Sequence, residues 1–217
     1  MSEPLPKAVL FDWDNTLVDN WEVIADAMNA TLSAMGHPIW TLEETRVRIR
    51  ASLRDSFPKM FGDRWPEARE IYYRAFAAHH LDKLQPMDGA ADLLRALHQR
   101  GLYLGVVSNK HGQYLRAEAE RLGWTSMFGA IVGAGDAAQD KPAPDPVIRA
   151  LLPSGIAPGP VVWFVGDADV DMQCGIGTGC RPVLLRAEPP APGEFEACPP
   201  ALYRASCHSL RQFMETL

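Results

Sequence analysis

The sequence lacks several features that mark particular classes of protein. Its 217 residues contain no run of about 18 uncharged apolar residues, so no segment is expected to span a membrane. The N-terminal stretch MSEPLPKAVLFDWD lacks the charged end and the long apolar stretch of a secretory signal peptide. Only four cysteines occur, all near the C-terminus. Without an export signal, we expect them to be free thiols in a cytoplasmic protein.

Positive charge is also scarce. The chain has 21 Lys and Arg residues against 27 Asp and Glu residues, a formal net charge of −6 with His neutral. Proteins that bind along a nucleic acid neutralise its phosphates with a basic surplus, so no nucleic-acid partner is expected. Apolar residues make up 47% of the chain, which allows a packed core. The length suits one ordinary domain with a small insertion.

Five short apolar runs without polar alternation are typical of buried strands. Helical patterns lie between them, such as one with an apolar face at Leu93, Leu94 and Leu97, for which Asp88 is the expected N-cap. Strands that alternate with helices predict an α/β fold, a doubly wound parallel sheet with helices on both faces. The expected strands are Ala8–Phe11, Leu102–Val107, Ala130–Gly133, Val161–Val165 and Pro182–Leu185.

One stretch interrupts this alternation. Between Val18 and Leu84 no strand pattern stands out, and apolar residues recur at helical spacing. We therefore expect a Rossmann-like α/β core made of residues 1–17 and 86–217. Residues 18–85 are expected to form a small all-helical cap, inserted after the first strand.

Charged residues gather where the predicted strands end, and ligands of doubly wound sheets collect beyond these carboxyl ends. Like charges about 4 Å apart repel by about 4 kcal/mol at an effective dielectric constant of about 20. Carboxylates from several strands are therefore expected to meet only around a cation. Oxygen ligands favour a hard ion that keeps some of its waters, which indicates Mg²⁺. The strand-end segments are DWDNT (12–16), SNK (108–110), Lys141 in DKPAPDP, and GDADVD (166–171).

These groups suit the transfer of a phosphoryl group. A divalent ion and Lys141 would neutralise the phosphoryl oxygens as charge shifts. Asp12 can attack phosphorus to form an aspartyl-phosphate. Asp14 can protonate the leaving oxygen and later deprotonate the attacking water.

The four segments, in this order, resemble the signature motifs of the haloacid dehalogenase superfamily. Over its whole length the chain is similar to the phosphoglycolate phosphatase-like hydrolases of that superfamily. The resemblance implies that Asp12 is the nucleophile and a Mg²⁺ ligand, and that Asp14 is the acid/base with its backbone carbonyl on the metal. It also implies that Asp167 binds Mg²⁺ and that Asp171 supports it through water or from the second shell.

The resemblance assigns roles to the remaining motif residues as well. Ser108 and Asn109 would hold the phosphoryl oxygens, and Lys141 would pair with both Asp12 and the phosphate. Thr16, grouped with these phosphate-binding residues, would brace the loop. A halide leaving group needs no proton, so the presence of Asp14 favours phosphate esters over halogenated acids.

Two residues depart from the usual motif. Asn15 stands where Gly is commonest, and because Asn tolerates positive φ, we expect the loop to keep its conformation. Trp13 stands where an aliphatic residue is usual, and either reshapes the floor of the pocket or packs in the core. In the cap, Arg46, Arg50 and Arg54 recur every four residues. They form a solvated face, or one of them meets an anionic group of the substrate.

The expected function is therefore that of a Mg²⁺-dependent phosphatase acting on a small phosphomonoester such as phosphoglycolate. A sugar phosphomutase that uses the same phosphoaspartate is the alternative. A non-catalytic phosphate-binding protein is a third, less favoured reading. The expected partner is a small-molecule phosphate ester, and the expected state is a monomer or a homodimer.

Overall fold

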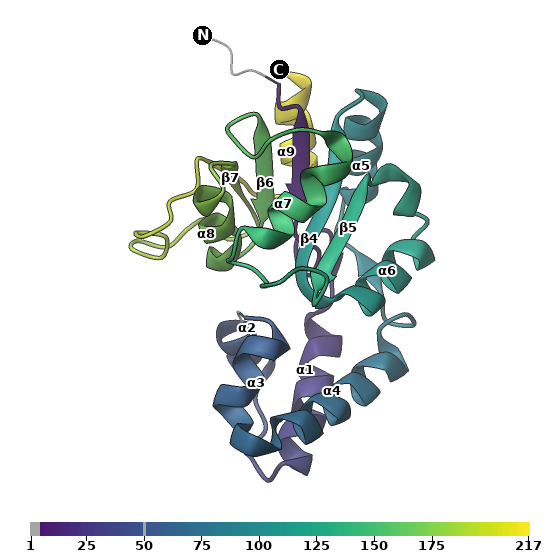
Figure 1. Cartoon of the computed structure of the whole chain (residues 1–217), viewed down its shortest axis with the longest axis vertical. Coiled ribbons are helices and arrows are strands. Elements are labelled where there is room, and N and C mark those ends of the chain that lie inside the picture. The colour runs from purple at the N-terminus through teal and green to yellow at the C-terminus, as the bar shows by residue number, and fades with distance from the viewer. Residues whose placement is uncertain (1–4, 50) are drawn as a thin grey trace.

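A six-stranded parallel sheet forms the centre of the computed structural model, which describes residues 5–49 and 51–217 (Figure 1). Its strand order is β5-β4-β1-β6-β7-β8, and every neighbouring pair is parallel. The predicted α/β fold is thus confirmed. The strands are β1 (Ala8–Phe11), β4 (Tyr103–His111), β5 (Ala130–Ala134), β6 (Val162–Gly166), β7 (Arg181–Leu185) and β8 (Leu202–Arg204).

Helices cover both faces of the sheet. Successive side chains of a strand point to opposite faces, and in β1 Val9 and Phe11 pack into one apolar cluster while Ala8 and Leu10 pack into the other. Burial on both sides explains why the strands read as unbroken apolar runs. The first cluster includes side chains of α5 (Ala90–Gln99), α6 (Gly112–Arg121) and α9 (Cys207–Glu215), and the second those of α7 (Asp145–Leu151) and α8 (Asp169–Gly177).

Four further helices lie together beyond the end of the sheet where β1 leads into them (Figure 1). They share an apolar cluster in which Phe57 packs edge-on against Phe61 and Tyr72. This cluster supports the expected cap, whose bounds at residues 18 and 85 stay a prediction. The helices are α1 (Trp21–Ala34), α2 (Leu42–Arg48), α3 (Leu53–Phe61) and α4 (Trp65–His79).

Some short elements differ from the sequence expectation. No strand was expected at Val18, yet β2 (Val18–Asp19) pairs antiparallel with β3 (Gln85–Pro86) where the cap helices join the core. A two-residue strand has no periodicity to reveal it. Gly89, with φ 77°, and not Asp88, precedes the first turn of α5. Short 3₁₀ helices occur at Gly62–Arg64, Thr125–Met127 and Leu152–Ser154.

None of the helices in the described part of the chain has the length and apolar content needed to cross a bilayer.

Candidate active site

The first motif forms a tight turn directly after β1. Asn15 has φ 64°, the left-handed conformation expected for it, and its N–H donates to the carbonyl of Val18 at 2.6 Å. The N–H of Leu17 donates back to the carbonyl of Trp13 at 2.9 Å. A residue that tolerates positive φ is required here, and Asn meets that need in place of Gly.

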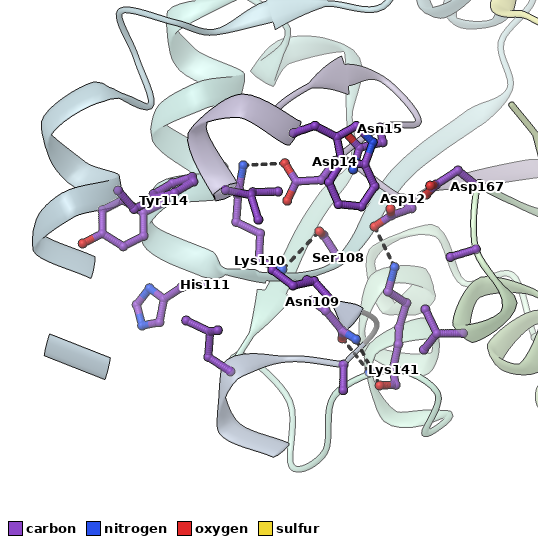
Figure 2. Close-up of a pocket in the computed structure, with 18 of the residues that line it drawn as sticks. Asp12, Asp14, Asn15, Ser108, Asn109, Lys110, His111, Tyr114, Lys141 and Asp167 are labelled. Carbon is purple, nitrogen blue, oxygen red and sulfur yellow. Dashed lines mark hydrogen bonds and ion pairs between the residues drawn. The ribbon is translucent and has the colours of Figure 1, made fainter. Parts of the chain in front are cut away.

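Lys141 joins the first and last motifs. Its buried Nζ lies 2.6 Å from Asp12 Oδ1 and 2.7 Å from Asp171 Oδ1. Figure 2 shows how Asn109 secures the backbone at this position: Asn109 Oδ1 accepts from the N–H of Lys141 at 3.0 Å, and Asn109 Nδ2 donates to its carbonyl at 3.2 Å. Burial alone would lower the pKa of Lys141, but the two carboxylates raise it. Lys141 therefore stays a cation.

Three carboxylates form a cluster of the size that a metal ion needs. One oxygen from each of Asp12, Asp167 and Asp171 lies within 4.8 Å of the others. Thr16 Oγ1 contacts Asp167 Oδ1 at 3.4 Å, which ties the first motif to the last. Burial, reinforced by Asp171 and opposed by Lys141, raises the pKa of Asp12 to about 7. A second cation beside Lys141 would stabilise the ionised form.

Asp14 occupies different surroundings from Asp12. Its Oδ1 accepts from Lys110 Nζ at 2.6 Å and from Asn20 Nδ2 at 2.6 Å. Figure 2 shows Asp14 and Lys110 on the opposite side of the pocket from Asp167. Burial raises the pKa of Asp14, although Lys110 opposes the shift. The two carboxylates of one motif therefore have separate cationic partners.

Glu118, which sequence reasoning missed, is the centre of a buried polar network behind Asp14. Its carboxylate accepts from Lys110 Nζ at 2.7 and 2.9 Å, from Trp13 Nε1 at 2.7 Å, and from Asn20 Nδ2 at 3.3 Å. His80 Nδ1 lies 2.9 Å away and carries the proton of that bond, because an ionised carboxylate only accepts. Burial alone would raise the pKa of Glu118, but Lys110 and these donors hold it below its usual value.

Trp13 packs inside the core, edge-on to Trp124 with ring centroids 5.7 Å apart. The structure thus favours packing over a role in the pocket floor. Ser108 was expected to follow its strand, but it lies within β4, and α6 begins only at Gly112 with His111 as its N-cap. Ser108 Oγ accepts from the N–H of Lys110 at 3.2 Å (Figure 2).

The arginines of the cap have different partners. Arg46 lies over the ring of Trp21 at 5.8 Å from its centroid. Arg54 reaches from α3 to Asp140 in the core, at 3.1 Å. Arg50 lies outside the described residues. Arg54 is therefore not simply solvated, since it bridges the cap helices and the loop that carries Lys141.

The motif residues open onto one cavity of about 120 Å³ between the sheet edge and the cap helices. The ammonium groups of Lys110 and Lys141 and the carboxylates of Asp12, Asp167 and Asp171 line this cavity. The residues that line it from the cap are apolar and aromatic. The core residues that line it include Asp12, Asp14, Asn15, Ser108, Asn109, Lys110, His111, Tyr114, Lys141, Asp167 and Asp171. The cap residues include Trp21, Ile24, Ile49, Ala51, Leu53, Tyr72, Tyr73 and Phe76.

Known proteins are similar to this chain in sequence and fold. The chain is 30% identical over 182 residues to a phosphoglycolate phosphatase of Aquifex aeolicus, covering 82% of this chain and 84% of that protein. It is 31% identical over 190 residues to an N-acetylmuramic acid 6-phosphate phosphatase of Pseudomonas aeruginosa, covering 83% of this chain and 81% of that protein. The crystal structure of a haloacid dehalogenase-superfamily hydrolase from Ehrlichia chaffeensis superimposes with a TM-score of 0.69 at 30% identity. The match covers 100% of this chain and 99% of that chain. Residues 9–185 match the haloacid dehalogenase-like hydrolase family, and the chain belongs to that family.

Proposed function

We propose that this protein is a phosphatase that hydrolyses a small-molecule phosphomonoester through a covalent phosphoaspartate. The observation that carries the proposal is the placement of Asp12 and Asp14 in one cavity with different partners. Asp12 lies among carboxylates and Lys141, whereas Asp14 lies apart, beside Lys110. One carboxylate can thus act as nucleophile while the other handles protons. The two relatives described above, both named as phosphatases, support this assignment.

The clustered carboxylates fit Mg²⁺. Mg²⁺ binds oxygens at about 2.0–2.1 Å, so ligands on opposite sides of the ion lie about 4 Å apart. The spacing within 4.8 Å of Asp12, Asp167 and Asp171 oxygens is close to this. Asp14 would contribute its backbone carbonyl, as the resemblance to the family implies, while Lys110 and Asn20 hold Oδ1 of its side chain. When bound, Mg²⁺ supplies positive charge against the carboxylates and the phosphoryl oxygens.

In the first step, a carboxylate oxygen of Asp12 attacks phosphorus. The bond from phosphorus to the ester oxygen breaks, and protonated Asp14 gives its proton to that leaving oxygen. Lys141 and the hydroxyl of Ser108 bind the phosphoryl oxygens as negative charge shifts onto them. Asn109 has a second N–H on Nδ2, beyond the one bound to the carbonyl of Lys141, which can donate to the same group.

In the second step, water attacks the phosphorus of the phosphoaspartate. Asp14, now ionised, accepts the proton of that water. The bond between phosphorus and Asp12 breaks, which releases inorganic phosphate and restores the carboxylate. A phosphomutase would instead return the phosphoryl group to a second hydroxyl of the substrate, so the products separate the two activities.

The test is hydrolysis of p-nitrophenyl phosphate and a panel of metabolite phosphates with Mg²⁺. We expect Asp12→Asn to abolish phosphate release, because an amide is a poor nucleophile. Asp169→Asn is the matched control: Asp169 belongs to the same GDADVD segment as Asp167 and Asp171, but we assign it no part in the chemistry. Wild-type rates in Asp12→Asn would refute the mechanism. Isomerised sugar phosphate without net phosphate release would indicate the mutase.

A further inference from the structure

A second, larger cavity adjoins the catalytic one. The catalytic cavity measures about 120 Å³ and its neighbour, here called the outer groove, about 780 Å³. Leu53, Tyr73, His111 and Tyr114 line both. Pockets that enclose small ligands typically measure about 300–1,000 Å³, so the catalytic cavity alone is small for a whole metabolite. A substrate larger than the phosphoryl group and a few atoms must therefore extend past these shared residues.

The shared wall lies on the side from which the leaving group departs. Asp14 protonates the leaving oxygen in the proposed mechanism, so the alcohol must project toward Asp14. Figure 2 shows His111 and Tyr114 on this side of the pocket, across from Asp167. The leaving group is thus directed at the shared wall and the outer groove behind it.

Three rings form this wall. Tyr73 of α4 lies 5.3 Å from His111 and 5.4 Å from Tyr114, measured between ring centroids, and the latter two are 5.8 Å apart. The hydroxyl of Tyr114 also donates to the backbone carbonyl of Tyr73 at 3.4 Å, which joins the core helix α6 to the cap helix α4 at this wall. Aromatic faces pack well against the C–H surface of a ring or chain and place polar groups at their edges.

Beyond the rings, the outer groove carries an excess of positive charge. Arg54, Arg69 and Arg74 line it, against the carboxylates of Glu70 and Asp140. Arg54 is paired with Asp140 at 3.1 Å. The guanidinium of Arg69 stacks on Trp65 at 5.1 Å from its ring centroid, which fixes its position.

This local excess stands out in a chain of net charge −6. Guanidinium groups that line the groove beyond an apolar wall favour a carboxylate, which they bind with paired N–H donors.

We infer that the substrate is the phosphomonoester of a sugar acid, whose carbon skeleton lies against Tyr73, His111 and Tyr114 and whose carboxylate reaches Arg69 and Arg74 in the outer groove. This assignment rests on the phosphatase activity proposed above and gives it a substrate class. It places the specificity of the enzyme in residues of the cap helix α4 as well as in the core.

The experiment compares three phosphate esters at saturating Mg²⁺: 6-phosphogluconate, glucose 6-phosphate and phosphoglycolate. The first two share a six-carbon skeleton and differ in the carboxylate, while the third has a carboxylate on a skeleton too short to reach the groove. We expect kcat/KM for 6-phosphogluconate to exceed that for each of the others by about tenfold or more, the ratio that one charge-assisted contact supplies.

The double variant Arg69→Gln/Arg74→Gln should remove the preference for 6-phosphogluconate over glucose 6-phosphate by raising KM for the acid alone. Arg95→Gln, an exposed arginine on α5 paired with Asp92, is the matched control and should keep the preference. Because the readout is a ratio between two substrates, a general loss of stability would not imitate it.

Each outcome separates this inference from the function on which it rests. Hydrolysis of p-nitrophenyl phosphate with equal rates on both six-carbon esters, or with phosphoglycolate preferred, would overturn the sugar-acid assignment and leave the phosphatase intact. A preference for 6-phosphogluconate that survives in the double variant would overturn the role of the arginines. An enzyme inert toward every ester, p-nitrophenyl phosphate included, would overturn both.

Discussion

At the scale of single residues, the site depends on how charge is distributed among buried groups. Lys110 lies between Asp14 and Glu118, and its ammonium binds both carboxylates within 2.9 Å. Without Glu118, the cation would face Asp14 alone and would favour its ionised form. In the proposed mechanism, Glu118 therefore helps Asp14 to keep the proton that it gives to the leaving group, while Lys110 remains charged.

Removal of the Glu118 carboxylate is expected to destabilise the fold strongly. Glu118→Ala would break the buried pair with Lys110, which would keep Asp14 as its carboxylate partner, and would leave the ring N–H of Trp13 without its acceptor. A broken buried ion pair costs about 3–5 kcal/mol. Urea denaturation followed by circular dichroism measures the free energy of unfolding. Glu120→Ala, at an exposed position on the same helix, should change it by less than about 0.5 kcal/mol. Similar values for the two variants would contradict the role of the network.

Mg²⁺ binding should depend on pH through Asp12. Burial, opposed by Lys141, raises the pKa of Asp12 to about 7, so the metal-free folded protein holds this proton more tightly than the unfolded chain does. The protonated carboxyl thus contributes stability at low pH that is lost as pH rises through about 7.

Since a ligand must be ionised, Mg²⁺ releases the Asp12 proton when it binds below this pKa, and affinity should fall by up to about tenfold per pH unit there. Isothermal titration calorimetry in buffers of different ionisation enthalpy counts the released protons. Asp12→Asn should abolish the pH dependence of any remaining affinity. Proton release that is equal in Asp12→Asn and wild type would assign it to another group.

The motif residues could be predicted from sequence, but the groups that support them could not. Asp12, Ser108 and Lys141 follow or end apolar runs that bring them to one edge of the sheet. Glu118 and His80 are far from these motifs and reach the site only through the packing of α6 and α4. A weak signal existed, because Glu118 falls on the apolar face of its helix, between Leu115 and Ala119, where a charge needs a buried partner.

At the scale of secondary-structure elements, β6 is adapted at its last residue to the carboxylate cluster. A Cβ added at Gly166 would lie 2.3 Å from Cγ of Asp171, so only glycine lets α8 bring this carboxylate to Lys141. The close approach of helix to strand also places the N–H of Ala168 3.1 Å from Asp171 Oδ2. The position of Asp171 in the carboxylate cluster therefore depends on the absence of a side chain at Gly166.

Gly166→Ala is expected to displace Asp171 and weaken both Mg²⁺ binding and catalysis. A shift of about 1 Å in a catalytic group can cost about a hundredfold in rate, and we expect a loss of kcat/KM of that order. Gly177→Ala is the control, because a Cβ there meets nothing within 4 Å. At this helical position alanine should stabilise the fold by about 0.5–1 kcal/mol without affecting activity. Normal activity in Gly166→Ala would show that Asp171 tolerates the move.

The longer elements were predictable from their patterns, and the shorter ones were not. The five strands buried on both faces appear as apolar runs, and α5 appears through the helical spacing of Leu93, Leu94 and Leu97. By contrast, β8 (Leu202–Arg204) has three half-buried residues and no apolar run to mark it. The antiparallel pair β2 and β3 involves residues far apart in sequence, and such pairing depends on the tertiary fold.

At the scale of the whole molecule, polar contacts join the cap helices to the core, and one of them lies beside Lys141. Arg54 of α3 binds Asp140 Oδ1, which also accepts from the N–H of Gly135 at 3.0 Å. Asp140 immediately precedes Lys141, and its side chain is 2% exposed. A contact across the cap–core boundary thus bears directly on the loop that carries Lys141.

Arg54→Gln is therefore expected to lower kcat/KM about tenfold, a loss of about 1.4 kcal/mol in transition-state stabilisation. The variant leaves the buried carboxylate of Asp140 without its cation, which favours conformations in which the cap moves away and water reaches the site. Arg48→Gln is the matched control: Arg48 is also a cap arginine, but its partner Glu44 lies on its own helix at 2.8 Å. Steady-state kinetics on p-nitrophenyl phosphate measure both variants. That substrate has no sugar acid to bind in the outer groove, so a defect confined to Arg54→Gln would reflect closure of the cap. Equal rates in both variants would show that the contact between Arg54 and Asp140 does not affect catalysis.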